Sequence, residues 1–181
     1  MQNDTPCIEE RYSAANHASN LKVEAERSGP ADIIIAAGMA PARLGAALIR
    51  LHSEWDGASK KRGKLSETDT RLLMGQLRSL PAVQDAVLWQ AEKWVIDDAQ
   101  KVVATALYWW VDHVCPACEG RGKEAIEGTP SLSKVACRVC HGSGERGLGY
   151  GQSARKIVAY LDDCAERAAH NIKARLYQMR K

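Results

Sequence analysis

The chain has 181 residues, of which 45% are hydrophobic and 26% are charged, and its formal net charge is +3. This composition is too apolar for a disordered polypeptide, and the net charge is too small to indicate a nucleic-acid partner by itself. The longest apolar runs, such as 33–37 and 102–111, are too short to span a bilayer, and no basic segment followed by an apolar core opens the chain. We therefore expect a cytoplasmic protein with one main core, neither secreted nor inserted in a membrane.

The first segment, residues 1–28, has no sustained apolar face, which predicts a flexible N-terminal arm with one short helix near 15–27. Charge is distributed unevenly along the chain. Residues 1–30 contain five acidic and three basic residues, whereas residues 115–181 contain twelve basic and seven acidic residues. The basic excess therefore lies in the C-terminal third of the chain.

Residues 29–113 carry apolar side chains at intervals of three and four, which predicts a helical domain. Gly38 and Pro41 interrupt this pattern near its start, so we expect a short helix and a longer helix joined by a tight turn. Two further helices are predicted at 65–80 and 82–113, and the second of these is the best candidate for a core helix.

Two matching segments contain four of the six cysteines: CPACEGRG at 115–122 and CRVCHGSG at 137–144. Two residues between paired cysteines allow both thiolates of a tight turn to bind one ion, and the glycines that follow permit a left-handed backbone. The 18 residues between the pairs are within the range of a four-cysteine site. The pattern predicts one structural Zn²⁺ ion bound by Cys115, Cys118, Cys137 and Cys140.

Four thiolates complete a tetrahedral zinc site and leave no position for water, so the metal is expected to stabilise structure without hydrolysis. Disulfides or thiols without metal are the alternatives, and the paired spacing in a chain without an export signal favours metal. His113 and His141 flank the motifs, and we expect both to lie outside the ligand set. No catalytic constellation is evident, so the protein is not expected to be an enzyme.

The helical pattern stops at Val114 and returns after Gly151, which makes residues 114–150 a zinc-binding insert and 151–181 a basic C-terminal helical segment. The predicted fold is therefore mainly α, a helical domain with an inserted four-cysteine zinc-knuckle module and a C-terminal helical segment. Basic side chains of the insert and tail are candidate DNA contacts, although basic helix faces are often only solvated. These candidates are Lys134, Arg138, Arg146, Arg155, Lys156, Arg167, Lys173 and Arg175, continued by Arg180 and Lys181.

The Cys-x-x-Cys-x-Gly-x-Gly pattern resembles the cysteine-rich region of DnaJ-type chaperones, which has four such repeats and binds two zinc ions. This chain has two repeats and no His-Pro-Asp tripeptide, which excludes a full cochaperone. The order of segments more closely resembles the late-gene antitermination protein Q family of lambdoid phages, in its lambda-type branch. Residues 32–51, DIIIAAGMAPARLGAALIRL, and the Gly-Tyr pair within 147–150 extend this resemblance over residues 30–181.

This resemblance implies a protein that binds double-stranded DNA within a late promoter and engages paused bacterial RNA polymerase, with its sigma factor as a further partner. Such proteins make the polymerase read through terminators, and the resemblance implies no small-molecule substrate. The tail lacks the proline and tryptophan that separate two helices in that family, so a helix-turn-helix and a single long helix are both open here.

Two other functions compete with antitermination. One is a zinc-knuckle protein-interaction module, a chaperone-like adaptor that binds peptides. The other is a transcription repressor or activator that uses 32–51 as a helix-turn-helix, although Arg43 and Arg50 are the only basic residues of that segment.

Overall fold

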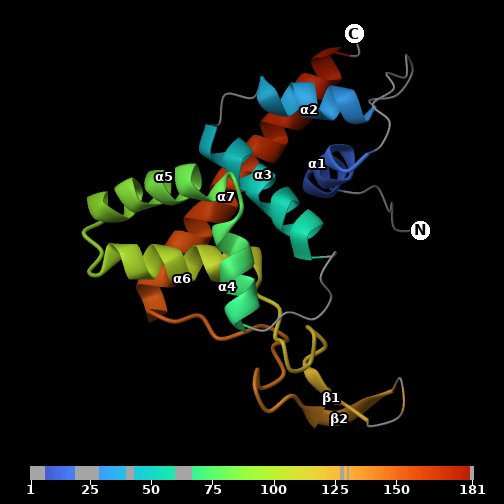
Figure 1. Ribbon diagram of the computed structural model, residues 1–181, viewed down its shortest axis with the longest axis vertical. Helices are drawn as coiled ribbons and strands as arrows, with labels where there is room; N and C mark the ends of the chain where they lie inside the picture. The colour runs from blue at the N-terminus through green and yellow to red at the C-terminus, as the bar shows by residue number, and fades with distance from the viewer. Residues whose placement is uncertain are drawn as a thin grey trace.

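The computed structural model describes residues 7–18, 29–39, 43–59, 67–126, 129 and 131–179. Its elements in chain order are α1 (Ile8–Asn16), α2 (Pro30–Gly38), α3 (Arg43–Ser59), α4 (Glu67–Gly75), α5 (Leu80–Lys93), α6 (Ala99–Val111), β1 (Lys123–Ala125), β2 (Leu132–Ala136) and α7 (Gly151–Met179). This arrangement confirms the predicted fold class: the helices form one body, and the cysteine-rich insert projects from it (Figure 1). None of the described helices is both long and apolar enough to cross a membrane.

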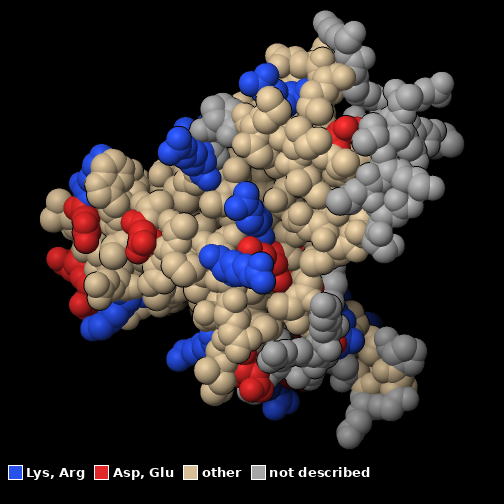
Figure 2. All heavy atoms as spheres, turned by 45° about the horizontal axis from the view of Figure 1, so that its top comes forward, with Lys and Arg blue, Asp and Glu red and all other residues tan. Residues whose placement is uncertain are grey.

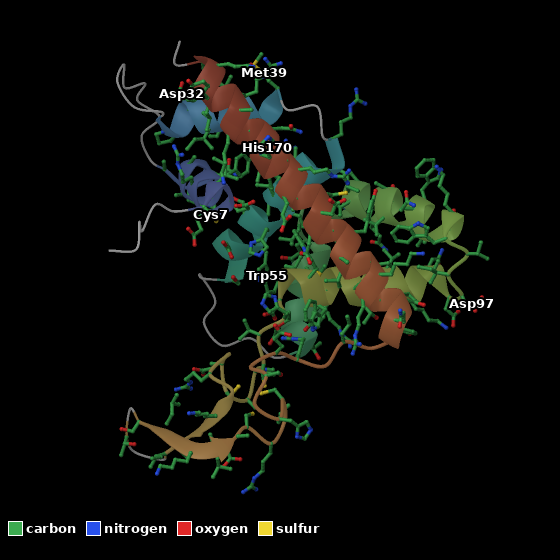
Figure 3. All side chains as sticks on the ribbon, turned by 180° about the vertical axis from the view of Figure 1, so that it is seen from behind. Cys7, Asp32, Met39, Trp55, Asp97 and His170 are labelled. Carbon is green, nitrogen blue, oxygen red and sulfur yellow. The ribbon has the colours of Figure 1, made fainter. Side chains whose placement is uncertain are left out.

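Helix α7 is the central element of the body. It packs against α1, α2, α3 and α6. Seen from behind, it runs across the helical body, and His170 lies on its exposed side (Figure 3). One side of its 29 residues is buried because small and aliphatic residues recur there at helical spacing: Ala154, Ile157, Leu161, Cys164, Ala165, Ala168, Ala169, Ile172 and Leu176. The C-terminal segment is therefore a single helix within the core, and it is not a separate unit beside a 29–113 domain. Arg180 and Lys181 lie outside the described residues.

The contact between α3 and α7 depends on a glycine. A Cβ atom added to Gly45 would overlap the backbone oxygen of Cys164 and lie 2.6 Å from the Cβ atom of Ala168. Only a residue without a side chain permits this close approach of the two backbones. Helix α3 consequently lies deep in the body, packed by α7 on one side and by α1 and α5 on others.

The prediction of a flexible arm is wrong for residues 8–16, which form helix α1. Ile8, Tyr12 and Ala15 are buried against α2, α3 and α7, and they belong to a second apolar cluster beside the main core. Helix α1 ends at Asn16, and most of the helix predicted at 15–27 lies outside the described part of the chain, which omits residues 19–28. A helix of nine residues has too few apolar positions for a convincing period, and its burial depends on distant partners.

The predicted helix over 82–113 is instead a hairpin of α5 and α6. Helix α5 ends in a Schellman motif, in which the N–H of Ile96 donates to the carbonyl of Ala91 and the N–H of Val95 donates to the carbonyl of Glu92. Val95 takes the left-handed position with φ of 55°, where glycine is usual, so the sequence carries no ordinary stop signal. Both helices still supply the core, as predicted for this region.

Two other predicted helix boundaries, near Gly38 and near residue 80, agree better with the structure. Helices α2 and α3 are separate, as the interruption at Gly38 and Pro41 predicts, although residues 40–42 lie outside the described residues. The helix predicted at 65–80 is shorter: α4 ends at Gly75, a turn follows, and α5 begins at Leu80. Residues 60–66, which include the start of that predicted helix, are outside the described part of the chain.

Candidate metal centre

The four predicted metal ligands meet in one cluster. The Sγ atoms of Cys115, Cys118, Cys137 and Cys140 all lie within 4.8 Å of one another, and all four residues are buried. The Sγ atoms of Cys118 and Cys140 are 3.6 Å apart, too far for a disulfide. Thiolates at the corners of a tetrahedron 2.3 Å from a central ion would be about 3.8 Å apart. The four cysteines could therefore hold one metal ion.

Each cysteine pair lies on a tight knuckle, and the two knuckles have equivalent internal hydrogen bonds. The backbone N–H of Gly122 donates to Sγ of Cys118 at 3.2 Å, and the N–H of Gly144 donates to Sγ of Cys140 at the same distance. Such bonds stabilise the negative charge of a thiolate. The repeat seen in the sequence thus corresponds to a repeat in the structure.

The two knuckles are also joined to each other reciprocally. The N–H of Cys115 donates to the carbonyl of Gly144 at 2.8 Å, and the N–H of Cys137 donates to the carbonyl of Gly122 at 2.9 Å. Each knuckle therefore positions the first cysteine of the other. A change to one knuckle should consequently disturb all four ligands.

The glycines of the motif are required by backbone geometry and by space. Gly122 has φ of +67°, and a Cβ atom there would lie 2.5 Å from the carbonyl oxygen of Gly142. Gly144 has φ of +79°, and its Cβ atom would lie 2.5 Å from the carbonyl oxygen of Gly120. Any side chain at either position would push the two knuckles apart.

Burial is the largest influence on the two thiols that contact each other. It raises the pKa of Cys118 to about 11, because a thiolate there is shielded from water. Burial also opposes ionisation of Cys140, but hydrogen bonds from the N–H groups of Gly144 and Gly142 outweigh it and lower the pKa of Cys140 to about 6. Four thiols at this separation can all ionise only if a cation offsets their repulsion, which suits a divalent metal ion.

The histidines beside the motifs lie outside this cluster. Among the described residues, the group that could hold a metal ion contains the four cysteines and no histidine. The imidazole of His113 packs beside the indole of Trp109, with ring centroids 5.3 Å apart, and His141 is exposed. The remaining cysteines, Cys7 and Cys164, are free thiols far from the motif in the sequence.

Arg146, predicted as a DNA contact, is instead part of the joint between the insert and α6. Its guanidinium donates to the hydroxyl of Tyr108 at 2.6 Å and to the carboxylate of Asp112 at 2.7 Å. Its backbone N–H donates to the carbonyl of His113, and its carbonyl accepts a bond from the indole N–H of Trp109. With 20% of its side chain exposed, Arg146 has little surface left for a phosphate.

Sequence reasoning missed the partners of Arg146. Tyr108 and Asp112 lie 38 and 34 residues before it in the chain. Neither residue belongs to a recognisable motif, and Asp112 follows the end of α6. Their role follows only from the way in which the insert folds back on α6.

Other predicted DNA contacts remain on the surface, and several have partners. The Arg138 guanidinium lies 3.0 Å from the carboxylate of Glu124, Arg167 pairs with Asp163 at 2.6 Å, and Arg175 donates to Gln178. The ammonium of Lys156 lies over the ring of Trp94. Arg155 lines a cleft of about 450 Å³ between the second knuckle and α7. Lys134 and Lys173 are exposed.

The exposed side of α7 carries acidic as well as basic side chains. Arg155 and Lys156 begin it, but Asp162, Asp163 and Glu166 interrupt it before the next basic side chains. The whole face of the molecule in Figure 2 likewise shows Lys and Arg interspersed with Asp and Glu. A polyanion would meet alternating charge along this helix, which weakens the case for α7 as the main phosphate contact.

Fold and site together define a helical protein with a projecting cluster of four cysteines that could hold a metal ion. Comparison with protein-family models, with curated proteins and with solved structures found no match to this chain.

Proposed function

We propose that this protein is a DNA-binding transcription antitermination factor of the lambdoid Q kind, acting in the cytoplasm of a bacterial host. It would bind a late-promoter element, engage RNA polymerase and its sigma factor, and make the polymerase read through terminators. The observation that supports this most directly is the four-cysteine double knuckle, inserted between a helical body and a last helix. That order of parts is the one on which the family resemblance rests.

We also propose that the bound metal is zinc. A buried set of four thiolates at tetrahedral spacing suits Zn²⁺, and iron is the main competitor for such a ligand set. Elemental analysis of the purified protein should find one zinc ion per chain, and Co²⁺ substitution should give the visible absorption of a tetrahedral thiolate site. A stoichiometric iron content would refute this assignment.

The metal would serve binding and not catalysis. Four protein thiolates complete the coordination of zinc and leave no position for a reacting water molecule. The ion would instead hold the two knuckles together, since each knuckle positions the first cysteine of the other. Metal loss should therefore abolish antitermination through loss of module structure.

The burial of α3 argues against the repressor or activator that would use 32–51 as a helix-turn-helix. A recognition helix needs a free face for the major groove. Helix α3 packs against α1, α5 and α7, and its exposed residues are Arg43 and Arg50. The projecting metal module is the better candidate for contact with DNA.

A peptide-binding adaptor remains the second candidate, because one observation favours it. The insert exposes several large apolar side chains to solvent, among them Ile126, Leu132, Val135 and Val139. An adaptor that used them would bind peptide with little dependence on salt. A DNA-binding protein would lose affinity steeply as the salt concentration rises.

The deciding experiment is transcription in vitro by bacterial RNA polymerase from the late promoter that neighbours this gene, through a terminator. The metal-loaded protein should increase readthrough, and Cys137→Ser should abolish this effect. Cys164→Ser is the matched control, because it removes a buried thiol that does not belong to the metal cluster. Unchanged termination with folded, metal-loaded protein would refute the proposal.

A further inference from the structure

The β hairpin of the insert is the part of the molecule farthest from the helical body (Figure 1). Strands β1 and β2 pair antiparallel with each other, with Lys123 opposite Ala136 and Ala125 opposite Leu132. Four of the five residues of β2 are exposed, so both faces of this strand are open to solvent as far as the described residues extend. Two-stranded ribbons are marginally stable in water, and their exposed strands are available to bind a partner.

The metal cluster anchors this ribbon at its base. Gly122 immediately precedes β1 and Cys137 immediately follows β2, and the N–H of Cys137 donates to the carbonyl of Gly122 at 2.9 Å. The ribbon therefore leaves the knuckles with both strands already joined. This anchoring supplies the rigidity that an isolated hairpin lacks, and it lowers the entropic cost of binding through the ribbon.

The charge of the ribbon is suited to a polyanion. Residues 121–138 contain four basic and two acidic side chains, although Glu127 lies outside the described residues. Lys123 and Lys134 are exposed, and the side chain of Arg138 is 87% exposed. The ion pair of Arg138 with Glu124 is a surface pair of little net stability, so the guanidinium can exchange it for a phosphate.

The shape of the ribbon is equally specific. Between the two paired positions β1 advances by two residues and β2 by four, so β2 bulges between Leu132 and Ala136. The hydroxyl of Ser133 accepts a bond from the N–H of Val135 at 3.1 Å and donates to the carbonyl of Val135 at 3.4 Å, which holds the bulge together. Bulges of this kind redirect side chains at functional edges. This one exposes a lysine and an apolar side chain next to each other in the chain, Lys134 and Val135.

We infer that the β1–β2 ribbon enters the major groove of duplex DNA. This groove admits a two-stranded ribbon and offers thymine methyl groups to apolar side chains. Val135 reaches the bases, and Lys123, Lys134 and Arg138 contact the flanking phosphates. This inference rests on the proposed function only in taking DNA as the ligand.

The test begins with selection of duplexes from a random-sequence pool by the full-length, metal-loaded protein. Binding of the selected duplex is then measured by fluorescence anisotropy over a range of salt concentrations. Lys134→Ala and Arg138→Ala should each make the plot of log affinity against log salt less steep, by about 1 in the magnitude of its slope. At 0.1 M salt this corresponds to an affinity about eightfold weaker. Lys93→Ala, at an exposed lysine of α5 that is not among the predicted DNA contacts, is the control and should leave both quantities unchanged.

Groove choice is tested on the same duplex. Methylation of guanine N7 in the major groove should block binding, and methylation of adenine N3 in the minor groove should not. Val135→Ala should change the selected sequence. Lys134, Val135 and Arg138 are exposed, so these variants should keep the metal content and melting temperature of the wild type.

The outcomes separate this inference from the proposed function. If the wild type selects a duplex but the ribbon variants bind it unchanged, or only adenine N3 methylation interferes, the ribbon inference is wrong and DNA binding stands. If the wild type selects no duplex, DNA binding itself fails, and the ribbon inference falls with it. If that wild-type protein binds peptide instead, and Val135→Ala abolishes peptide binding, the ribbon would be assigned to a protein partner.

Discussion

Replacing Arg146 with alanine distinguishes a structural role from a DNA contact. The Arg146 guanidinium lies 2.7 Å from the carboxylate of Asp112, and the two side chains are only 20% and 22% exposed. The hydroxyl of Tyr108 accepts a second bond from the same guanidinium. Without the guanidinium, the Asp112 carboxylate loses the countercharge that it has in the folded protein. The variant should therefore lose stability, and not DNA affinity alone.

The size of this loss follows from the exposure of the pair. Removing one partner of a buried pair costs about 3–5 kcal/mol, whereas an exposed pair contributes about 0–1 kcal/mol. Because about four-fifths of each side chain is buried, the pair lies nearer the buried limit. We expect Arg146→Ala to lower the free energy of unfolding by about 3 kcal/mol. In a chain of this size, that corresponds to a fall in Tm of about 6–12 °C.

Urea and thermal unfolding of the metal-loaded protein, followed by circular dichroism, would measure this change. Arg138→Ala is the control, because that side chain is 87% exposed and should cost less than about 0.5 kcal/mol. The reasoning is refuted if Arg146→Ala unfolds like the wild type while its salt dependence of DNA binding falls by about one charge. That result would make Arg146 a phosphate contact, as the sequence predicted.

Three further substitutions test the packing and the metal site. Gly45→Ala should lower the free energy of unfolding by about 1–3 kcal/mol, because its Cβ atom would overlap the Cys164 carbonyl; an unchanged urea midpoint would contradict this. Gly144→Ala should weaken metal binding in competition with a chromophoric chelator, because its Cβ atom would crowd the Gly120 carbonyl; wild-type affinity would show that the knuckles can separate. Val95→Gly should raise stability by about 1 kcal/mol, since an exposed side chain there holds a left-handed backbone; a lower Tm would show that the valine makes a stabilising contact.

The cluster of four cysteines could be predicted from the sequence because the residues that form it lie close together in the chain. Two residues between the cysteines set the width of each knuckle, and the glycines that follow have positive φ in the structure. All four thiols and both conformational requirements lie within two segments of eight residues, 115–122 and 137–144. The helical character of the rest was equally predictable, because it depends on apolar residues recurring every three or four positions.

The features that the sequence did not predict depend on distant partners or on atypical residues. The role of Arg146 depends on Tyr108 and Asp112, which the fold brings to it across more than 30 residues. The end of α5 was hidden because Val95 occupies a position that usually belongs to glycine. The sequence left open whether the last segment is one helix or a helix-turn-helix, and its place as the central helix α7 depends on packing against α1, α2, α3 and α6.

Two sets of contacts set the position of the ribbon relative to the helical body: the bonds of Arg146 and the cysteine cluster. The chain leaves the core at the end of α6 and returns to it at the start of α7, and these two helices pack on each other. Arg146 joins the base of the insert to α6, and the cysteine cluster joins the two knuckles farther along the insert. If DNA binds at the ribbon while the polymerase binds the helical body, both sets of contacts help to keep the two binding sites in a fixed relative position. Opening the base through Arg146→Ala should then reduce readthrough more than it reduces DNA affinity, whereas metal removal should abolish both.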